Sequence, residues 1–175
     1  VNGLVGSEMC IRDSNNNCFS YEKKIRKSLI KHKIHYSLFF YGTLRSLEVR
    51  KAVIGESSDH HNTSSGDLFK HKVYKVKNAN YPLIKYTNNE VDVVRGLFIN
   101  NITFEELIKL DRFEGKNYFR QFVKVSVDKI NHDAQIYMPS KNMISEEPWN
   151  YEDWYKNDMK NFFLNEFDLN GVKEV

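Results

Sequence analysis

Hydrophobic and polar positions divide the chain into an aperiodic, polar start and a region of short periodic elements from residue 36 onward. The apolar run YSLFFY, residues 36–41, ends at Gly42 and predicts a buried strand. Ser46 then precedes LEVRKAVI, which predicts a short helix that begins after the serine cap and ends at Gly55. Residues 56–67 are polar and match no motif, so we expect them to form a loop.

The middle of the chain alternates strand-like runs with turn residues. The runs LFKHKVYKV, YPLIKY and VDVVRGLFI predict strands at residues 68–76, 81–86 and 91–99. Thr103 and Glu106 have the spacing of a capping box and predict a helix that ends at Gly115. The predicted buried face of this helix contains Phe104, Leu107 and Ile108.

The last third of the chain predicts two more strands and a closing helix. FRQFVKVSV, residues 119–127, alternates with period two, and DAQIYM, residues 133–138, follows an expected Asn131-His132-Asp133 turn. Trp149 and Asn150 open the helix, and its expected packing residues are Trp154, Phe162 and Phe163. About six strands with inserted helices predict an α+β domain, a small mixed β-barrel or sheet over residues 36–168, followed by a tail at 169–175.

The positive charge of the chain comes from its first segment. Residues 1–36 contain seven Lys or Arg against three Asp or Glu, and the remainder contains 19 against 20, within an overall net charge of +3. The remainder has no basic stripe interleaved with aromatic residues, so nucleic-acid binding is not expected. No apolar run approaches the ~20 residues that a membrane-spanning helix needs, so no membrane association is expected either.

Residues 1–35 are interpreted as a leader outside the domain. GSEMCIRDS, within residues 1–14, resembles translated sequencing-adaptor sequence, and we interpret it as an artefact. The basic stretch YEKKIRKSLIKHK is interpreted as a solvated helix or disordered arm in preference to an organelle-targeting arm. Both cysteines, Cys10 and Cys18, lie in this leader, which excludes disulfides and a cysteine nucleophile from the domain and suits a cytoplasmic location.

Two short segments of the domain carry candidate chemistry. The turn YGTL, residues 41–44, joins a strand to a helix, where free backbone amides suit a carboxylate or phosphate. Gly42 would let a ligand approach the backbone, although a plain structural corner explains the same residues. Glu114 lies between an aromatic residue and a glycine, where desolvation would raise the pKa of its carboxyl and suit it to proton transfer. A surface glutamate in the last helical turn is the alternative.

Five motifs occur in an order shared with a known family. FFYGTLR, NYPLI, VRGLFI, LDRFEGKNYFRQFVKV and AQIYM, over about residues 36–140, resemble the γ-glutamylcyclotransferase-like family, also called the avirulence-induced-gene-like family. Pro148-Trp149 and the closing helix resemble its bacterial-type members. The resemblance implies a mixed barrel with a cavity at one end and Glu114 as the catalytic acid/base. It implies substrate contacts from Tyr41, Gly42, Thr43 and Leu44, and from two pocket tyrosines, Tyr118 and Tyr137.

The implied reaction is an intramolecular cyclisation. The α-amine of a small γ-glutamyl compound attacks its own γ-carbonyl, leaving 5-oxoproline and a released amine or amino acid. Neither an enzyme nucleophile nor a metal or other cofactor is required. The leaving group stays open between a peptide, a lysine side chain, a polyamine and another amine. A non-catalytic module that uses the cavity for small-molecule sensing or protein interaction is the alternative. We expect a monomer or weak dimer with a small γ-glutamyl substrate.

The remaining motifs predict no further catalytic or binding site. His60 and His61 are adjacent in the polar loop and lack the spacing of a metal site, so we interpret them as surface residues. The chain contains no phosphate-binding loop, dinucleotide fingerprint or nucleophile elbow.

Overall fold

The computed structural model describes residues 10–12, 18–20, 35–140 and 143–171. The chain forms two compact units, residues 1–34 and 35–175. The first unit contains two antiparallel strands, β1 (Cys10–Arg12) and β2 (Cys18–Ser20), although this stretch shows no strand period in its sequence. The predicted basic arm within residues 21–33 lies outside the described residues.

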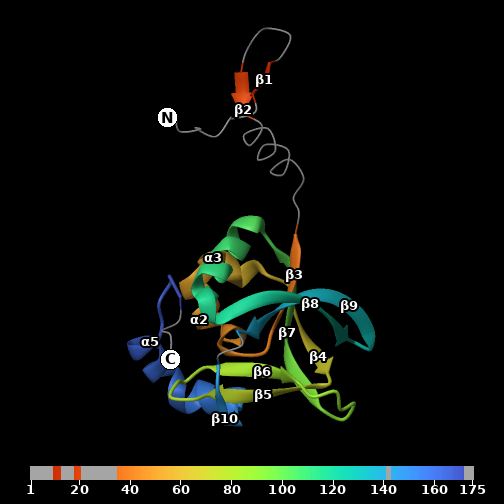
Figure 1. Ribbon diagram of the computed structural model, residues 1–175, viewed down its shortest axis with the longest axis vertical. Coiled ribbons are helices and arrows are strands. Elements are labelled where there is room, and N and C mark those ends of the chain that lie inside the picture. The colour runs from red at the N-terminus through yellow and green to blue at the C-terminus, as the bar shows by residue number, and fades with distance from the viewer. Residues whose placement is uncertain (1–9, 13–17, 21–34, 141–142, 172–175) are drawn as a thin grey trace, which may run out of the picture. The chain divides into compact units, whose positions relative to one another are not determined.

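The second unit contains the elements that build the fold (Figure 1). Its strands are β3 (Tyr36–Phe40), β4 (Thr63–Phe69), β5 (His71–Val76), β6 (Pro82–Tyr86), β7 (Val93–Ile102), β8 (Tyr118–Val127), β9 (Ile130–Pro139) and β10 (Ser145–Pro148). Its α-helices are α2 (Leu47–Ile54), α3 (Phe104–Glu114), α4 (Tyr151–Asp153) and α5 (Met159–Asn165), and a π-helical turn, η4 (Trp154–Asp158), joins the last two. Three 3₁₀ turns are η1 (Thr43–Arg45), η2 (Glu56–His60) and η3 (Gly115–Asn117).

Five strands close into a barrel in the order β3-β7-β4-β8-β9. The ladders within this order are antiparallel, and the barrel closes through a parallel pairing of β3 with β9, in which Leu38 lies opposite Gln135. Strands β10, β5 and β6 form a second, three-stranded sheet. The prediction of an α+β domain on a small mixed barrel is therefore confirmed.

Strand β3 contributes to two hydrophobic cores because its side chains alternate between its two faces. Leu38 and Phe40 pack in the core that also contains residues of the helices, whereas Phe39 and Tyr41 pack among the barrel strands. A Cβ atom on Gly96 would lie 2.5 Å from Cζ of Phe39, so this glycine makes room for the Phe39 ring. The end of β3 therefore meets both cores where the turn at Gly42 begins.

The predicted helix caps are confirmed. Oγ of Ser46 accepts a hydrogen bond from the backbone N–H of Val49 at 3.2 Å and starts α2. Oγ1 of Thr103 accepts from the backbone N–H of Glu106 at 3.3 Å, and the Glu106 carboxylate accepts from the backbone N–H of Thr103 at 2.8 Å. These local contacts fix where α2 and α3 begin.

Three predicted boundaries are wrong. The expected loop at 56–67 contains η2 and the first half of β4. The single strand expected at 68–76 is broken at Lys70, whose φ of 63° turns the chain from β4 in the barrel to β5 in the second sheet. The turn expected at 131–133 lies instead at Asp128 and Lys129, which have φ values of 49° and 66° and join β8 to β9.

The predicted buried face of α3 is also wrong in part. Leu107 is buried, but Phe104 and Ile108 are 55% and 44% exposed. The face that packs on the domain instead carries Leu107, Leu110 and Phe113, which follow the three-residue spacing of one helical side. In the closing helical segment, Trp154 and Phe162 are buried as predicted and Phe163 is partly buried.

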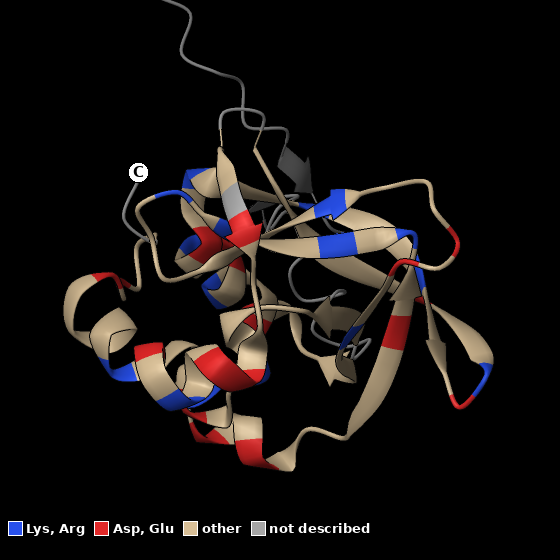
Figure 2. Ribbon diagram, turned by 90° about the horizontal axis from the view of Figure 1, so that it is seen from below, with Lys and Arg blue, Asp and Glu red and all other residues tan. Residues whose placement is uncertain are grey.

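Figure 2 shows lysine, arginine and acidic residues interspersed along the helices and strands of the described structure. None of the helices among the described residues is long and apolar enough to cross a membrane.

Candidate active site

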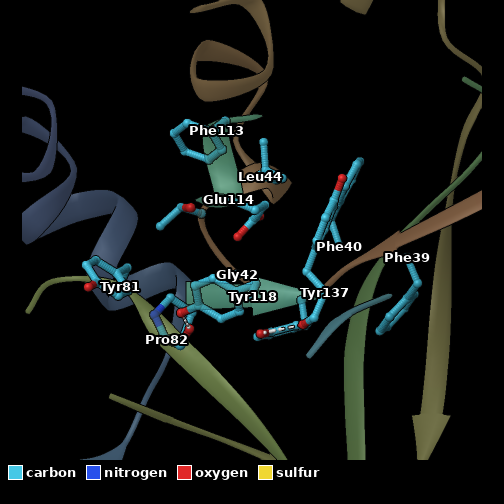
Figure 3. Close-up of a pocket in the computed structure, with 12 residues that line it drawn as sticks. Phe39, Phe40, Gly42, Leu44, Tyr81, Pro82, Phe113, Glu114, Tyr118 and Tyr137 are labelled. Carbon is cyan, nitrogen blue, oxygen red and sulfur yellow. Dashed lines mark hydrogen bonds between the residues drawn. The ribbon is translucent and has the colours of Figure 1, made fainter. Parts of the chain in front are cut away.

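A pocket opens where the end of β3, the start of β6, the end of α3 and the strands β8 and β9 meet (Figure 3). It brings together all seven residues to which the sequence assigned a site: Tyr41, Gly42, Thr43, Leu44, Glu114, Tyr118 and Tyr137. The other lining residues are Phe39, Phe40, Tyr81, Pro82 and Phe113. Tyr81 and Pro82 belong to the NYPLI motif, to which no site role was assigned.

The floor of the pocket is formed by the turn after β3. The backbone N–H of Arg45 donates to the carbonyl of Gly42, and that of Ser46 donates to Thr43, both at 3.0 Å. Within the described residues, the N–H groups of Gly42, Thr43 and Leu44 have no backbone or side-chain acceptor. These three donors belong to residues that line the pocket, at the start of a helical turn, where N–H groups have no partner within the helix.

Packing explains why position 42 is a glycine, in addition to the access for a ligand that the sequence led us to expect. The φ of Gly42, −110°, lies outside the left-handed region that favours glycine. A Cβ atom at this position would lie 2.7 Å from Cγ of Pro82, in the opposite wall of the pocket. Because a proline ring cannot swing aside, the close approach of the Gly42 backbone to Pro82 excludes larger residues.

Glu114 is the only carboxyl group among the described residues that line the pocket, and these include no lysine, arginine or histidine. It lies at the C-terminal end of α3, partly buried, and Figure 3 shows it projecting toward Gly42 and Tyr118. Desolvation by burial raises the pKa of its carboxyl to about 8, and the nearby Asp111 carboxylate adds to the effect. Gly115 follows with a φ of 60°, which lets the chain leave the helix directly after Glu114.

Three tyrosines form fixed walls of the pocket because their hydroxyl groups are already hydrogen-bonded to other protein groups. The hydroxyl of Tyr41 donates to the backbone carbonyl of Tyr137 at 2.9 Å. The hydroxyl of Tyr118 donates to the carbonyl of Pro82 at 2.6 Å. Burial raises the pKa of Tyr41, Tyr118 and Tyr137 well above the ordinary value of 10.0, so all three stay neutral at physiological pH. The site therefore combines neutral walls with a single carboxyl group.

Asp111 lies behind the pocket and connects its walls. Its carboxylate accepts two hydrogen bonds from Arg120, at 2.7 and 3.0 Å, and one from the Tyr137 hydroxyl at 2.8 Å. Arg120 also donates to the side-chain amide oxygen of Gln135. Asp111 is part of the LDRFEG motif, but its role is not visible in the sequence because its partners come from β8 and β9.

The interpretation of His61 as a surface residue is wrong. Its side chain is 5% exposed, and its Nε2 lies 3.1 Å from Oε1 of Glu106 in the capping box of α3. Ser57 donates to the same carboxylate at 2.6 Å, so the segment at 56–61 is tied to the start of α3. Across the described part of the chain, no group of three or more His, Cys, Asp or Glu side chains is arranged to hold a metal ion.

Two plant proteins are similar to this chain over most of its length. AIG2-like protein C of Arabidopsis thaliana is 27% identical over 138 residues, which cover 77% of each protein. AIG2-like protein D of the same plant is 26% identical over 132 residues, 73% of this chain and 84% of that protein. These relatives lend no support to the expected bacterial-type affiliation.

Solved structures share the fold at lower identity. A structure described as a gamma-glutamyl cyclotransferase superposes with a TM-score of 0.57 at 16% identity, covering 81% of this chain and 90% of the other. The solution structure of an Arabidopsis thaliana protein superposes with a TM-score of 0.56 at 23% identity, covering 75% of this chain and 79% of the other. The model of the family "Gamma-glutamyl cyclotransferase, AIG2-like" matches residues 38–156, which include every element that lines the pocket. The chain therefore belongs to the gamma-glutamyl cyclotransferase, AIG2-like family.

Proposed function

We propose that this protein is a γ-glutamylcyclotransferase that converts a small γ-glutamyl compound to 5-oxoproline and releases an amine or amino acid. The observation that carries the proposal is the single carboxyl group of Glu114 in a pocket of otherwise uncharged side chains, with its pKa raised to about 8. Membership of the cyclotransferase family supports it.

Glu114 acts in two proton transfers. In the first, its ionised carboxylate takes a proton from the α-ammonium group of the substrate, and the freed amine attacks the γ-carbonyl carbon. In the second, the protonated Glu114 gives that proton to the leaving nitrogen as the carbon–nitrogen bond of the amide breaks. The attacking nitrogen loses its second proton to the released amine, which departs as an ammonium ion, and the ring nitrogen ends as a lactam N–H. A carboxyl with a pKa of about 8 is much closer to an ammonium group in proton affinity than an ordinary glutamate with a pKa of 4.5, so the first transfer is less uphill than it would be to an unperturbed carboxylate.

The turn at 42–44 binds the substrate in this proposal. Its three unpaired N–H groups donate to the α-carboxylate or to the oxyanion that develops on the γ-carbonyl. Tyr41, Tyr118 and Tyr137, held by their own hydrogen bonds, supply rigid apolar faces around the bent substrate. Because the attack is intramolecular, holding the reacting atoms together supplies several kcal/mol of the barrier reduction.

The test is 5-oxoproline release from a panel of γ-glutamyl compounds with peptide, lysine-side-chain, polyamine and simple amine leaving groups. Glu114→Gln keeps the shape of the side chain and removes the proton acceptor, so turnover should fall by about 10²–10⁴ while substrate affinity changes little. Asp133→Asn is a matched control, because Asp133 forms an exposed ion pair with Lys124 and does not line the pocket. Full activity in the glutamine variant would exclude Glu114 as the acid/base. Binding of the panel without 5-oxoproline release from the wild type would instead indicate the non-catalytic module.

A further inference from the structure

We propose that Asp111 is a positioning residue of this site, which fixes the Tyr137 wall and places a carboxylate, ion-paired with Arg120, one helical turn from Glu114. The proposal rests on the proposed cyclotransferase function. It adds to that function a residue that does not line the pocket.

The first part of the proposal follows from the contacts of Asp111. Arg120 holds the Asp111 carboxylate with two hydrogen bonds at 2.7 and 3.0 Å, so the carboxylate cannot rotate freely. The Tyr137 hydroxyl donates to one of the same oxygens at 2.8 Å, and the Tyr137 carbonyl accepts from Tyr41 at 2.9 Å. Hydrogen bonds to Asp111 thus link α3 to β8 and β9 behind the pocket.

The second part of the proposal, the negative charge near Glu114, follows from helix geometry. Asp111 and Glu114 are three residues apart in α3, so they lie on neighbouring positions of one helical side. A carboxylate at this separation opposes a second negative charge, and it raises the pKa of Glu114 beyond the effect of burial.

The other groups that face Glu114 do not replace Asp111 in this role. The ionisable side chains around the carboxyl are Tyr41, Tyr81, Tyr118 and Tyr137. Burial raises the pKa of Tyr81 to about 12 and also raises the pKa values of the other three, so these groups are neutral across the working range of pH. Asp111 is therefore the charged group that raises the proton affinity of Glu114 beyond the effect of burial.

Two substitutions separate the charge of Asp111 from its hydrogen bond. Asp111→Asn removes the negative charge but keeps an oxygen that accepts from Tyr137. Tyr137→Phe removes the hydroxyl and keeps the charge. Asp133→Asn, in the exposed pair with Lys124, makes the same chemical change elsewhere on the barrel and serves as the control.

The measurement is the pH dependence of kcat/KM for 5-oxoproline release, together with a carbon NMR titration of the Glu114 carboxyl in protein labelled at glutamate. Asp111→Asn should move the acid limb of the profile and the Glu114 titration together to lower pH. Tyr137→Phe should raise KM and leave both near the wild-type pH, and Asp133→Asn should change neither. The folded state of each variant is checked by its proton NMR dispersion.

An Asp111→Asn protein that keeps the wild-type Glu114 titration would overturn the proposal, as would an equal shift in Asp133→Asn. The NMR titration of Glu114 does not require the protein to be catalytically active. If no γ-glutamyl compound yields 5-oxoproline, the proposed function fails, whereas the Glu114 titration in the Asp111 variant still decides the role of Asp111.

Discussion

Replacing Glu114 with glutamine should stabilise the protein, and the gain should grow with pH. In the unfolded chain a glutamate ionises near its ordinary pKa of 4.5, whereas in the folded protein the Glu114 carboxyl keeps its proton up to a pKa of about 8. Between these two values the folded state holds more protons than the unfolded state, so wild-type stability falls as pH rises. A glutamine cannot ionise in either state, and it escapes this loss.

The size of the effect follows from the two pKa values. One pKa unit corresponds to about 1.4 kcal/mol, so the free-energy difference between variant and wild type should widen by about 1.4 kcal/mol per pH unit from pH 5 to pH 8. At pH 7, which is 2.5 units above 4.5, the variant gains about 3 kcal/mol over its value in acid, and above pH 8 the gain levels off near 5 kcal/mol. These figures are upper bounds, because water that enters the pocket screens the charge.

Urea unfolding at pH 5, 6, 7 and 8, followed by circular dichroism, measures the difference directly. Glu105→Gln is the matched control, because Glu105 is exposed in the first turn of the same helix. Its substitution removes a favourable interaction with the helix dipole, so it should cost less than about 1 kcal/mol and yield no gain. A Glu114→Gln difference that stays constant from pH 5 to pH 8 would show that the folded protein does not hold this carboxyl neutral.

Two further substitutions test the packing. Gly42→Ala should destabilise the fold by about 1–3 kcal/mol, because its Cβ would meet the Pro82 ring at 2.7 Å, and a second substitution, Pro82→Ala, should recover much of the loss in thermal unfolding. Leu110→Ala should cost about 2–5 kcal/mol in urea unfolding because Leu110 is fully buried, whereas Ile108→Ala on the exposed side of α3 should cost far less; equal costs would contradict the observed helix face.

Features whose partners lie close in sequence were predictable. The caps at Ser46 and Thr103 depend on residues three positions away, and they occur as expected. The positive φ of Gly115 depends on the absence of a side chain, which the sequence displays. Lys70 also has a positive φ, of 63°, without any such signal, because it joins strands that belong to two different sheets.

The candidate site was predictable as a set of residues but not as a set of contacts. Glu114 and the turn at 41–44 were found because a family resemblance joins two motifs that no local rule connects. The burial of His61 depends on Glu106, 45 positions further along the chain, and the role of Asp111 depends on Arg120 and Tyr137 in neighbouring strands. A side chain whose environment is supplied by distant strands looks like a surface residue in the sequence.

The pocket is complete only after β3 has paired with β9 in parallel and the barrel has closed. The Tyr41–Tyr137 hydrogen bond joins residues 96 positions apart, and the barrel is closed at the same place. Contacts of such long sequence separation form slowly, because most of the chain must be ordered before they are made. During synthesis on the ribosome the turn at Gly42 emerges early, yet the pocket lacks its Tyr137 wall until β9 follows. A ligand of this pocket therefore recognises only the finished barrel, and its binding would report completed folding.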